Sequence, residues 1–197
     1  MASLDTKMIL ADSLVSLLKE KPIEKITIQE IVDQSGFNRQ TFYYHFTDIF
    51  DLLEWILKRR YGLLSEHLIF DAEDPLITKI EKLFDHLSEN RITFLHSYNP
   101  KYRYYYEGII RPWIHEQIKK IIENAPLSKE ILPEERKFIT DSFTWVFIGL
   151  FFEWLEKGMP KQRRESIEDY YLLIQVSIDA SLKAFAEKNR SLSHKRD

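Results

Sequence analysis

A block of hydrogen-bonding side chains occupies residues 38–45, and their types are those that read nucleic acids. The block consists of Asn38, Arg39, Gln40, Thr41, Tyr43, Tyr44 and His45. Arginine pairs with guanine O6 and N7, glutamine pairs with adenine N6 and N7, and threonine touches the thymine methyl group. Tyrosine and histidine suit phosphate oxygens. The block therefore predicts contacts to the base edges and the backbone of double-stranded DNA.

Two short helices are predicted to position this block. Thr27 and Glu30 form a capping box that begins one helix, and Asn38 caps the next. Between them, Gly36 suits the left-handed conformation at a helix end. Apolar residues at helical spacing hold both helices against a helix at about residues 5–20; they are Ile28, Ile31, Val32, Phe37, Phe42 and Phe46. The pattern is typical of a helix-turn-helix, whose second helix enters the major groove.

The charge distribution confines a DNA contact to a local patch. The formal net charge of the chain is -3, and residues 1–60 contain eight basic and nine acidic residues. A broad basic field, which would attract nucleic acid from a distance, is therefore absent. However, no acid occurs from Gln34 to Thr47, and Arg39 and His45 lie inside that stretch.

The remainder of the chain also predicts helices. Only 5 glycines and 7 prolines interrupt the chain, which favours long helices over a sheet with many turns. A fourth helix is expected from Thr47 toward Phe70, with a boundary loop at residues 71–75. Further helices are expected at about residues 76–90, 91–98, 105–124, 134–157 and 166–188. We therefore predict an all-α fold with a helix-turn-helix domain at residues 1–60 and a helical domain at residues 61–197.

The segment from Thr27 to Phe46 reads Thr-Ile-Gln-Glu-Ile-Val-Asp-Gln-Ser-Gly-Phe-Asn-Arg-Gln-Thr-Phe-Tyr-Tyr-His-Phe. It resembles the DNA-binding signature of the TetR family of bacterial transcriptional regulators. That signature has a Thr-x-x-x-Ile helix, a Gly-Val/Phe-Ser/Asn turn and a Thr-Leu/Phe-Tyr-x-His/Tyr-Phe recognition helix. The likeness covers about residues 5–60. It implies a three-helix DNA-binding domain followed by a C-terminal helical bundle for dimerisation and ligand binding.

The resemblance also implies roles for individual residues. Base contacts are implied for Arg39, Gln40, Thr41 and Tyr43, with Gln29 on the preceding helix as an additional one. Phosphate contacts are implied for Thr27, Tyr44 and His45.

One position departs from the family pattern. The family usually has a lysine shortly after the final Phe of the signature, where it holds a phosphate, whereas this chain has Ile49 followed by Phe50. One phosphate anchor is therefore expected to be missing. The backbone N–H groups of Asp48 and Ile49 would have to take its place.

The function implied by the resemblance is sequence-specific regulation of transcription. The commonest outcome in the family is a repressor that a small-molecule effector releases from its operator. The implied partners are palindromic double-stranded DNA, a second copy of the chain, and an effector or a partner protein, with no cofactor. Two alternatives stay open: a transcriptional activator of the same family, and a helical protein-interaction module that no longer binds DNA. Residues 48–56 also look like the subgroup that includes dihydroxyacetone-kinase operon activators.

Two apolar stripes in the last two predicted helices are wider than one packing partner would cover. One consists of Ile139, Phe143, Val146, Leu150 and Trp154, and the other of Ile167, Tyr171, Ile174, Ile178 and Leu182. They either complete the core of one chain or form a four-helix bundle with a second copy. A dimer is favoured because a helix-turn-helix reads a palindrome with two copies. The predicted interface residues are Phe143, Phe147, Leu150, Trp154, Tyr171, Ile174 and Ile178.

The middle of the chain is rich in aromatic residues. They are Phe94, Tyr98, Tyr102, Tyr104, Tyr105, Tyr106 and Trp113. These residues either line an effector cavity or fill a core, so the ligand residues stay unassigned. His86, His96 and His115 are predicted to be isolated polar residues, and no metal site is expected.

Catalysis is not expected. The chain has no cysteine, which excludes thiol nucleophiles and fits a reducing cytoplasm. His115 and Glu116 begin a zinc-protease pattern, but Lys119 stands where the second histidine belongs. Glu134 and Glu135 are acids at a predicted helix start, where the helix dipole accounts for them.

Membrane association is not expected either. The richest apolar stretch, residues 143–155, contains Glu153 and is shorter than the roughly 18 residues of a membrane span. A buried helix is the better interpretation of this stretch. The first ten residues are too polar for a signal peptide. We therefore predict a cytoplasmic protein.

Overall fold

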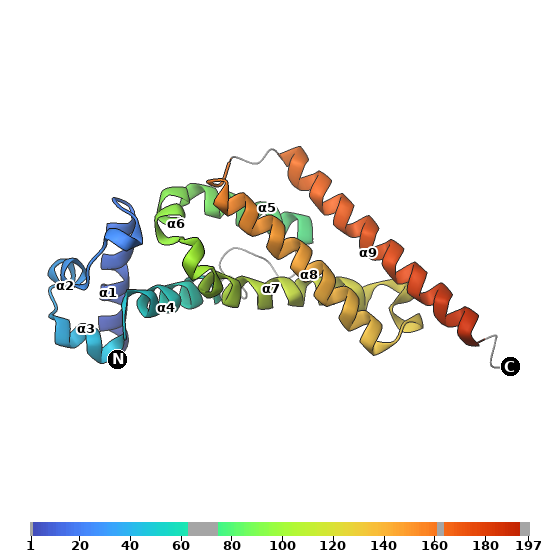
Figure 1. The fold of residues 1–197 in the computed structure, drawn as a ribbon, viewed down its shortest axis with the longest axis horizontal. Helices are drawn as coiled ribbons and strands as arrows, with labels where there is room; N and C mark the ends of the chain where they lie inside the picture. Colours follow the sequence, from blue (N-terminus) through green and yellow to red (C-terminus); the bar gives the residue numbers. More distant parts are fainter. Residues whose placement is uncertain (1, 63–74, 161–163, 194–197) are drawn as a thin grey trace. The chain divides into compact units, whose positions relative to one another are not determined.

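The computed structural model describes residues 2–62, 75–160 and 164–193, and within these ranges it contains helices and no strands (Figure 1). The α-helices are α1 (Ala2–Leu18), α2 (Ile28–Ser35), α3 (Arg39–His45), α4 (Ile49–Gly62), α5 (Leu76–Glu89), α6 (Arg91–Ser97), α7 (Arg103–Asn124), α8 (Pro133–Glu156) and α9 (Arg164–Ser193). Short 3₁₀ helices occur at η1 (Ile23–Lys25), η2 (Pro100–Tyr102) and η3 (Pro126–Glu130). The predicted all-α fold is confirmed. The boundary loop expected before Pro75 lies outside the described residues.

The chain divides into two compact units. Unit 1 comprises Met1–Ala72 with Leu83–Ile109, and unit 2 comprises Glu73–Lys82 with Ile110–Asp197. Unit 1 therefore contains α6 and the start of α7, which the sequence assigned to the second domain. The predicted domain boundary after residue 60 falls near the end of α4 and stays a prediction.

The core of unit 1 is built where α1, α2, α3 and α4 meet. Its fully buried apolar side chains include Leu10, Leu14, Leu18, Ile31, Val32, Phe42 and Leu52. Phe42 and Phe46 lie four residues apart and are both buried, so one face of α3 packs inward. α6 joins this unit through His96, whose Nδ1 lies 2.8 Å from the carbonyl oxygen of Leu18. That contact satisfies a carbonyl that the last turn of α1 would otherwise leave unpaired.

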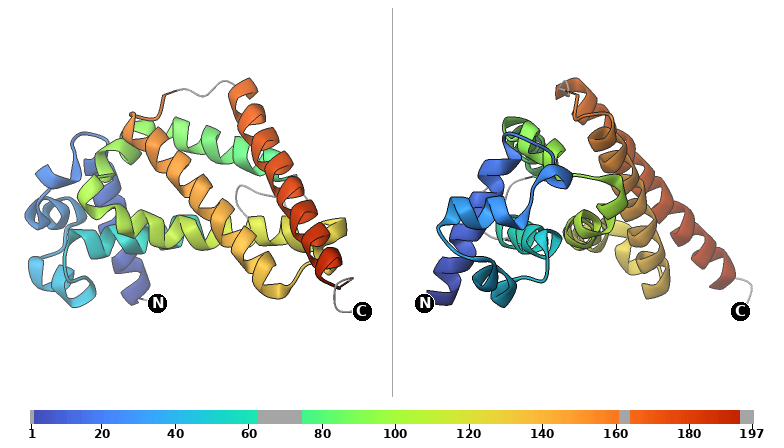
Figure 2. Two further views of the ribbon diagram at one scale, coloured as in Figure 1. Left: turned by 45° about the vertical axis from the view of Figure 1, so that its right-hand side comes forward. Right: turned by 60° about the vertical axis from the view of Figure 1, so that its left-hand side comes forward.

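Unit 2 is built around α8 and α9, which lie side by side in opposite directions (Figure 2). Buried side chains at helical spacing fill its core, and they are Ile114, Ile118 and Ile122 of α7, Ile139, Ile148 and Phe152 of α8, and Ile178, Leu182 and Ala186 of α9. α8 ends at a left-handed turn, in which Gly158 has φ 81° and Met159 has φ 53°. The buried Met159 side chain holds this turn against the core.

α7 continues from unit 1 into unit 2 and contains a proline. Pro112 lies inside the helix and has no N–H to donate to the carbonyl of Gly108, four residues earlier. The boundary between the two units falls between these residues, after Ile109. The sequence predicted a helix over this span without the interruption of its hydrogen bonding.

By length and composition, α8 is the one helix in the described part of the chain that is apolar enough to cross a bilayer. This is weak evidence for a membrane span, because the core helix of a soluble protein has the same properties. Phe151, Phe152, Trp154 and Leu155 are all buried against the rest of the chain. Residues 143–155 therefore lie within a helix that supplies much of the core of unit 2.

A buried carboxylate joins the first turn of α8 to the end of α9. Glu135 accepts hydrogen bonds from Lys188 Nζ at 2.9 Å, from Asn189 Nδ2 at 2.7 Å and from the N–H of Leu132 at 3.0 Å. Burial opposes ionisation of Glu135, but the hydrogen bonds from Lys188, Leu132 and Asn189 outweigh it and lower its pKa to about 2. The ionised carboxylate therefore stabilises the packing of α9 on α8.

Replacement of Glu135 by glutamine is expected to lower the free energy of unfolding at neutral pH by about 2 kcal/mol, because charge-assisted hydrogen bonds are lost. The pKa of Glu135 falls from 4.5 to about 2 on folding, so the stabilisation is complete above about pH 4.5 and is lost as the pH falls toward 2. Urea unfolding of both proteins should show their difference shrinking across that range. Glu130→Gln, which removes a more exposed ion pair with Arg190, should change the stability by less than about 1 kcal/mol. A pH-independent difference between Glu135→Gln and the unmodified chain would contradict this account.

Candidate nucleic-acid interface

The start of α2 is fixed by a capping box. The side chain of Thr27 accepts from the N–H of Glu30 at 3.3 Å, and Glu30 accepts from the N–H of Thr27 at 2.9 Å. Lys21 forms an ion pair with the same carboxylate. The hydrogen bonds from Lys21 and then from the backbone and side chain of Thr27 lower the pKa of Glu30 to about 2. The Glu30 charge is therefore held by its neighbours, and the box predicted from the sequence is confirmed.

The turn between α2 and α3 depends on Gly36. Its φ of 74° is in the left-handed region, and its N–H donates to the carbonyl of Val32. The N–H of Phe37 donates to the same carbonyl at 3.1 Å. A residue with a Cβ atom would be strained at this φ, although no neighbouring atom would contact that Cβ. The glycine is therefore needed for the backbone conformation that redirects the chain into α3.

α3 is a short helix that begins at a side-chain cap. The Oδ1 atom of Asn38 accepts from the N–H of Thr41 at 2.8 Å and from the Thr41 hydroxyl at 3.1 Å. These two predicted DNA-binding side chains are thus engaged with each other in the free protein. The Nδ2 group of Asn38 takes no part in the hydrogen bonds with Thr41, which both use Oδ1.

The face of α3 that points away from the buried Phe42 and Phe46 is exposed. Arg39 and Gln40 are exposed, and Tyr43 and Tyr44 are 58% and 82% exposed. These four residues repeat at i, i+1, i+4 and i+5, so they form one stripe along the helix. His45 is half-buried beside this stripe. The structure therefore places Arg39, Gln40 and Tyr43, three of the residues predicted to contact bases, on one accessible surface. Thr41, also predicted to contact a base, is half-buried and bonded to Asn38.

Two further predicted residues lie on or just before α2. Gln29 is exposed, and its Nε2 donates to Asp33 Oδ1 at 2.6 Å. Thr27 is exposed but uses its hydroxyl in the capping box. A phosphate contact by Thr27 would have to share the oxygen that begins α2.

The start of α4 differs from what a phosphate anchor requires. Asp48 accepts from the N–H of Asp51, and Asp51 accepts from the N–H of Thr47, each at 2.8 Å. Two carboxylates therefore occupy the helix end where the sequence predicted backbone N–H groups to hold a phosphate. Their negative charge opposes a phosphate at this position.

Phe50 has a structural use that the sequence did not reveal. Its ring centroid lies 3.8 Å from that of Tyr102 and 6.1 Å from that of Tyr105, with the Tyr105 ring stacked at 7°. Within unit 1 this aromatic cluster joins α4 to η2 and the start of α7. Asn99 adds a hydrogen bond to Glu24 in η1. Tyr102 and Tyr105 therefore pack inside unit 1, which agrees with the core interpretation for these two residues, whereas Tyr104 is 60% exposed.

Sequence reasoning also missed Lys7. Its Nζ atom lies 5.3 Å from the ring centroid of Phe46, which places a cation beside the C-terminal end of α3. Lys7 and Phe46 are 39 positions apart, so no local sequence pattern could have indicated this contact.

In unit 2 the predicted dimer residues differ in burial. Trp154 and Ile178 are buried in the core of the chain, and the Trp154 indole donates to the carbonyl of Pro160 at 2.9 Å. Five are half-buried, namely Phe143, Phe147, Leu150, Tyr171 and Ile174. The exposed large apolar residues of α8 and α9 are instead Phe138, Trp145, Val146, Tyr170, Leu172, Leu173, Val176 and Leu192. The predicted set therefore mixes core residues with partly exposed ones of α8 and α9, and the dimer interface itself stays a prediction.

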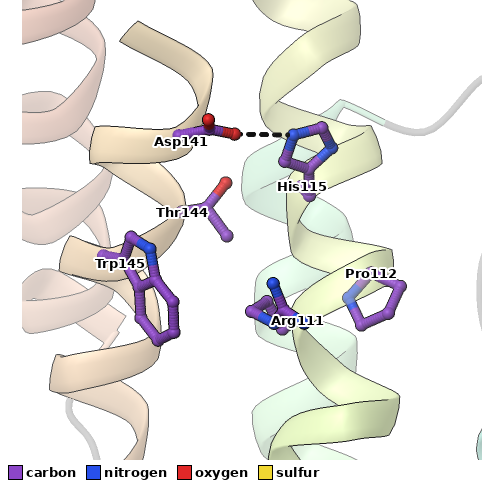
Figure 3. Close-up of a pocket in the computed structure, with 6 residues that line it drawn as sticks. All are labelled: Arg111, Pro112, His115, Asp141, Thr144 and Trp145. Atoms are coloured by element: carbon purple, nitrogen blue, oxygen red, sulfur yellow. Dashed lines mark hydrogen bonds and ion pairs between the residues drawn. The ribbon is translucent and has the colours of Figure 1, made fainter. Parts of the chain in front are cut away.

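Unit 2 also contains a cavity between α7 and α8 with a volume of about 300 Å³ (Figure 3). It is lined by Arg111, Pro112, His115, Asp141, Thr144 and Trp145. Neither the cavity nor its residues were assigned from the sequence, except that His115 was predicted to be an isolated polar residue. His115 instead lies 3.1 Å from Asp141, measured from Nε2 to Oδ1.

A short N-terminal helix-turn-helix followed by a helical unit defines a class of DNA-binding regulators. Residues 10–56 match the family described as bacterial regulatory proteins, tetR family. Residues 75–175, more than half of the chain, match a transcriptional regulator C-terminal region of TetR type. The chain therefore belongs to the TetR family and is a DNA-binding transcriptional regulator. Members of this family are generally not enzymes.

Several solved structures share the fold. A TetR transcriptional regulator from Streptococcus agalactiae 2603V is 20% identical, with a TM-score of 0.61 over 88% of this chain and 95% of that chain. The dihydroxyacetone kinase operon activator DhaS is 19% identical, with a TM-score of 0.56 over 91% and 97%. A TetR-family regulator from Streptomyces coelicolor is 17% identical, with a TM-score of 0.60 over 95% and 89%. No curated protein matches the chain. At these identities the likeness concerns the fold alone.

Variants of the capping residue Asn38 distinguish an effect on stability from an effect on DNA binding. Asn38→Ala is expected to lower the free energy of unfolding by about 1 kcal/mol, because the N–H of Thr41 loses its acceptor. Asn38→Asp keeps an acceptor at the same place and should retain the stability of the unmodified chain. The added negative charge next to Arg39 should nevertheless weaken binding to a DNA fragment. Urea unfolding and gel-shift titration measure the two effects, and equal stability of the alanine and aspartate variants would contradict the role of the cap.

Proposed function

We propose that this regulator binds a palindromic operator as a cytoplasmic homodimer, with α3 in the major groove, and represses transcription until a small-molecule effector releases it. The observation that carries the DNA-binding part is the stripe of Arg39, Gln40, Tyr43 and Tyr44. It is exposed on a helix whose other face is buried through Phe42 and Phe46. No acidic residue interrupts this surface from Gln34 to Thr47.

Within this proposal Arg39 and Gln40 read bases, because they come first in α3 and carry the side chains that pair with guanine and adenine. Thr41 and Tyr43 add base contacts, and Gln29 of α2 adds one from the neighbouring helix. Thr27, Tyr44 and His45 hold phosphates, which set the register but carry no sequence information. Asn38 orients the helix through its cap and lies at the edge of the same surface.

The proposed dimer uses the outer faces of α8 and α9. Leu172, Leu173 and Val176 are 60%, 63% and 56% exposed. Together with Val146 of α8 they form more exposed apolar surface than scattered single residues would. The half-buried residues that the sequence predicted, Phe143, Phe147, Leu150, Tyr171 and Ile174, border these positions on the same two helices. Trp154 and Ile178 support the interface from the core.

Effector control is supported by the course of α7. This one helix carries Tyr105, which stacks on Phe50 of α4, and two turns later Arg111 and His115, which line the cavity of unit 2. Repression is proposed as the commoner outcome in the family. An activator remains the second candidate because residues 48–56 look like the subgroup of dihydroxyacetone-kinase operon activators. A reporter gene behind the operator separates the two, since deletion of the regulator raises expression only under repression.

Arg39→Ala is expected to reduce the preference for the operator over unrelated DNA by about 1–3 kcal/mol, because a bidentate contact to guanine is lost. Sequences selected from a random DNA pool supply the operator, and gel-shift titrations at several salt concentrations give both affinities. Lys25→Ala is the control, because Lys25 is an exposed cation of unit 1 outside α3. The operator preference of that variant should not change. If Arg39→Ala keeps full discrimination, the assigned recognition face is wrong.

Leu173→Asp is expected to shift the chain from dimer to monomer and to weaken operator binding with it. A charge at a position that the second copy covers must be desolvated or separated. Light scattering coupled to gel filtration measures the mass, and circular dichroism checks that the helices persist. Ile92→Asp is the matched control, because Ile92 is a 57% exposed apolar residue on α6 of unit 1. Dimerisation of Leu173→Asp at the affinity of the unmodified chain would refute this interface.

A further inference from the structure

The cavity of unit 2 lies between α7 and α8, and each helix contributes lining residues from a segment of about one turn. α7 contributes Arg111, Pro112 and His115, and α8 contributes the remaining three lining residues, Asp141, Thr144 and Trp145 (Figure 3). Its volume of about 300 Å³ is at the lower end of the roughly 300–1,000 Å³ of ligand pockets. A ligand of this cavity is therefore small, on the scale of a single ring with one substituent.

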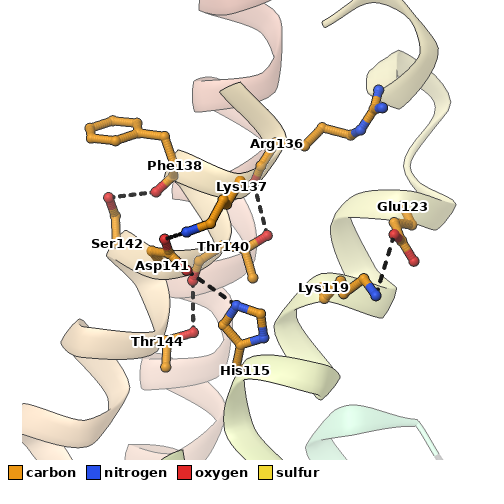
Figure 4. Close-up of polar contacts among 10 residues, drawn as sticks. All are labelled: His115, Lys119, Glu123, Arg136, Lys137, Phe138, Thr140, Asp141, Ser142 and Thr144. Carbon is orange, nitrogen blue, oxygen red and sulfur yellow. Dashed lines mark hydrogen bonds and ion pairs between the residues drawn. The ribbon is translucent and has the colours of Figure 1, made fainter. Parts of the chain in front are cut away.

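The hydrogen-bond acceptors of the lining are already engaged by the protein. Asp141 accepts from Lys137, one turn earlier, and its Oδ1 lies 3.1 Å from Nε2 of His115 (Figure 4). The hydroxyl of Thr144 donates to the carbonyl of Thr140 at 2.7 Å. The hydrogen bond from Lys137, opposed by burial and assisted by His115, lowers the pKa of Asp141. The acid of this cavity therefore stays ionised and neutralised by its own neighbours.

The N–H donors of Arg111, unlike the acceptors of the lining, are not paired with a carboxylate of the described part of the protein. Arg111 is exposed, and its guanidinium carbon lies 5.6 Å from the ring centroid of Trp145. Among the residues that the structure describes, no carboxylate lies within 4.0 Å of this guanidinium. The contact with the Trp145 ring orients the cation without neutralising it. The cavity thus offers a planar set of N–H donors beside an aromatic ring and the apolar edge of Pro112.

We propose that this cavity binds a small carboxylate with a planar apolar body, of the class of single-ring aromatic acids. The carboxylate pairs with the fork of Arg111, which matches its geometry with two parallel N–H···O bonds. The ring of the ligand packs against the exposed part of Trp145 and against Pro112. The proposal rests on the proposed function only where it makes this ligand the effector.

Calorimetric titration of the full chain, without DNA, tests the site with three probes. Benzoate has both the charge and the ring, acetate has the charge alone, and benzamide has the ring alone. Benzoate should bind with a dissociation constant on the order of 1 mM or tighter, as expected for a small ligand in a partly open site. Acetate and benzamide should bind at least about tenfold more weakly. No saturation with benzoate by about 10 mM, or equal binding of benzamide, would overturn the proposal.

Variants of α7 locate the site. Arg111→Gln should weaken benzoate at least about tenfold, because the charge-assisted pair is lost. Arg111→Lys keeps the charge without the planar fork, so its benzoate affinity should lie between those of the unmodified chain and Arg111→Gln. Lys120→Gln, an exposed cation on the same helix outside the cavity, should bind benzoate like the unmodified chain. Thermal unfolding confirms that each variant folds. Unchanged benzoate affinity in Arg111→Gln would overturn the assignment.

Operator binding is measured in parallel by gel shift. If the protein shifts its operator but does not bind benzoate, the cavity assignment is overturned and the proposed function still holds. A chain that binds benzoate through Arg111 but shifts no DNA supports the cavity and overturns the proposed function. Weaker operator binding with benzoate, absent in Arg111→Gln, is the result expected when both proposals hold.

Discussion

Burial of Phe42 and Phe46 is the interaction on which the DNA-binding surface depends. α3 has seven residues, and a helix of that length is unstable alone because nucleation costs more than so few hydrogen bonds return. The two rings pack into the core formed by α1, α2 and α4, and their spacing of four residues fixes the rotation of α3 about its axis. That rotation turns Arg39 and Tyr43 toward solvent. The caps at Thr27 and Asn38 decide where the helices begin, but only the buried rings decide which side faces outward.

The negative net charge of the chain limits how this surface attracts DNA. Glu30 is paired with Lys21, and Asp48 and Asp51 cap the start of α4. These acids are held in fixed geometry, yet their charge is still present near α3. Long-range attraction is therefore weak, and affinity depends on short contacts made after the helix reaches the groove. If few phosphates are neutralised in this way, we expect the salt dependence of binding to be shallower than that of a strongly basic protein.

Local signals were predictable from the sequence, and long-range contacts were not. The capping box at Thr27, the turn at Gly36 and the cap at Asn38 each depend on residues within a few positions, so their spacing predicted α2 and α3. Phe50 packs against Tyr102, which follows 52 positions later, and no local pattern could reveal that pair. Periodicity likewise marked α8 and α9 as apolar on wide faces. It could not show that Trp154 points into the core of the chain.

α7 contributes side chains to both units, because the boundary between them falls within this helix. Its first turn carries Tyr105 against Phe50, and its middle carries Arg111 beside Trp145. Pro112, the residue after Arg111, has no N–H to donate to the carbonyl of Gly108, so the turn from Gly108 to Pro112 has one helical hydrogen bond fewer. A glycine there removes the side-chain restriction on the backbone as well. Arg111 lies within this turn, so a ligand held by Arg111 would act on α7 where its hydrogen bonding is interrupted.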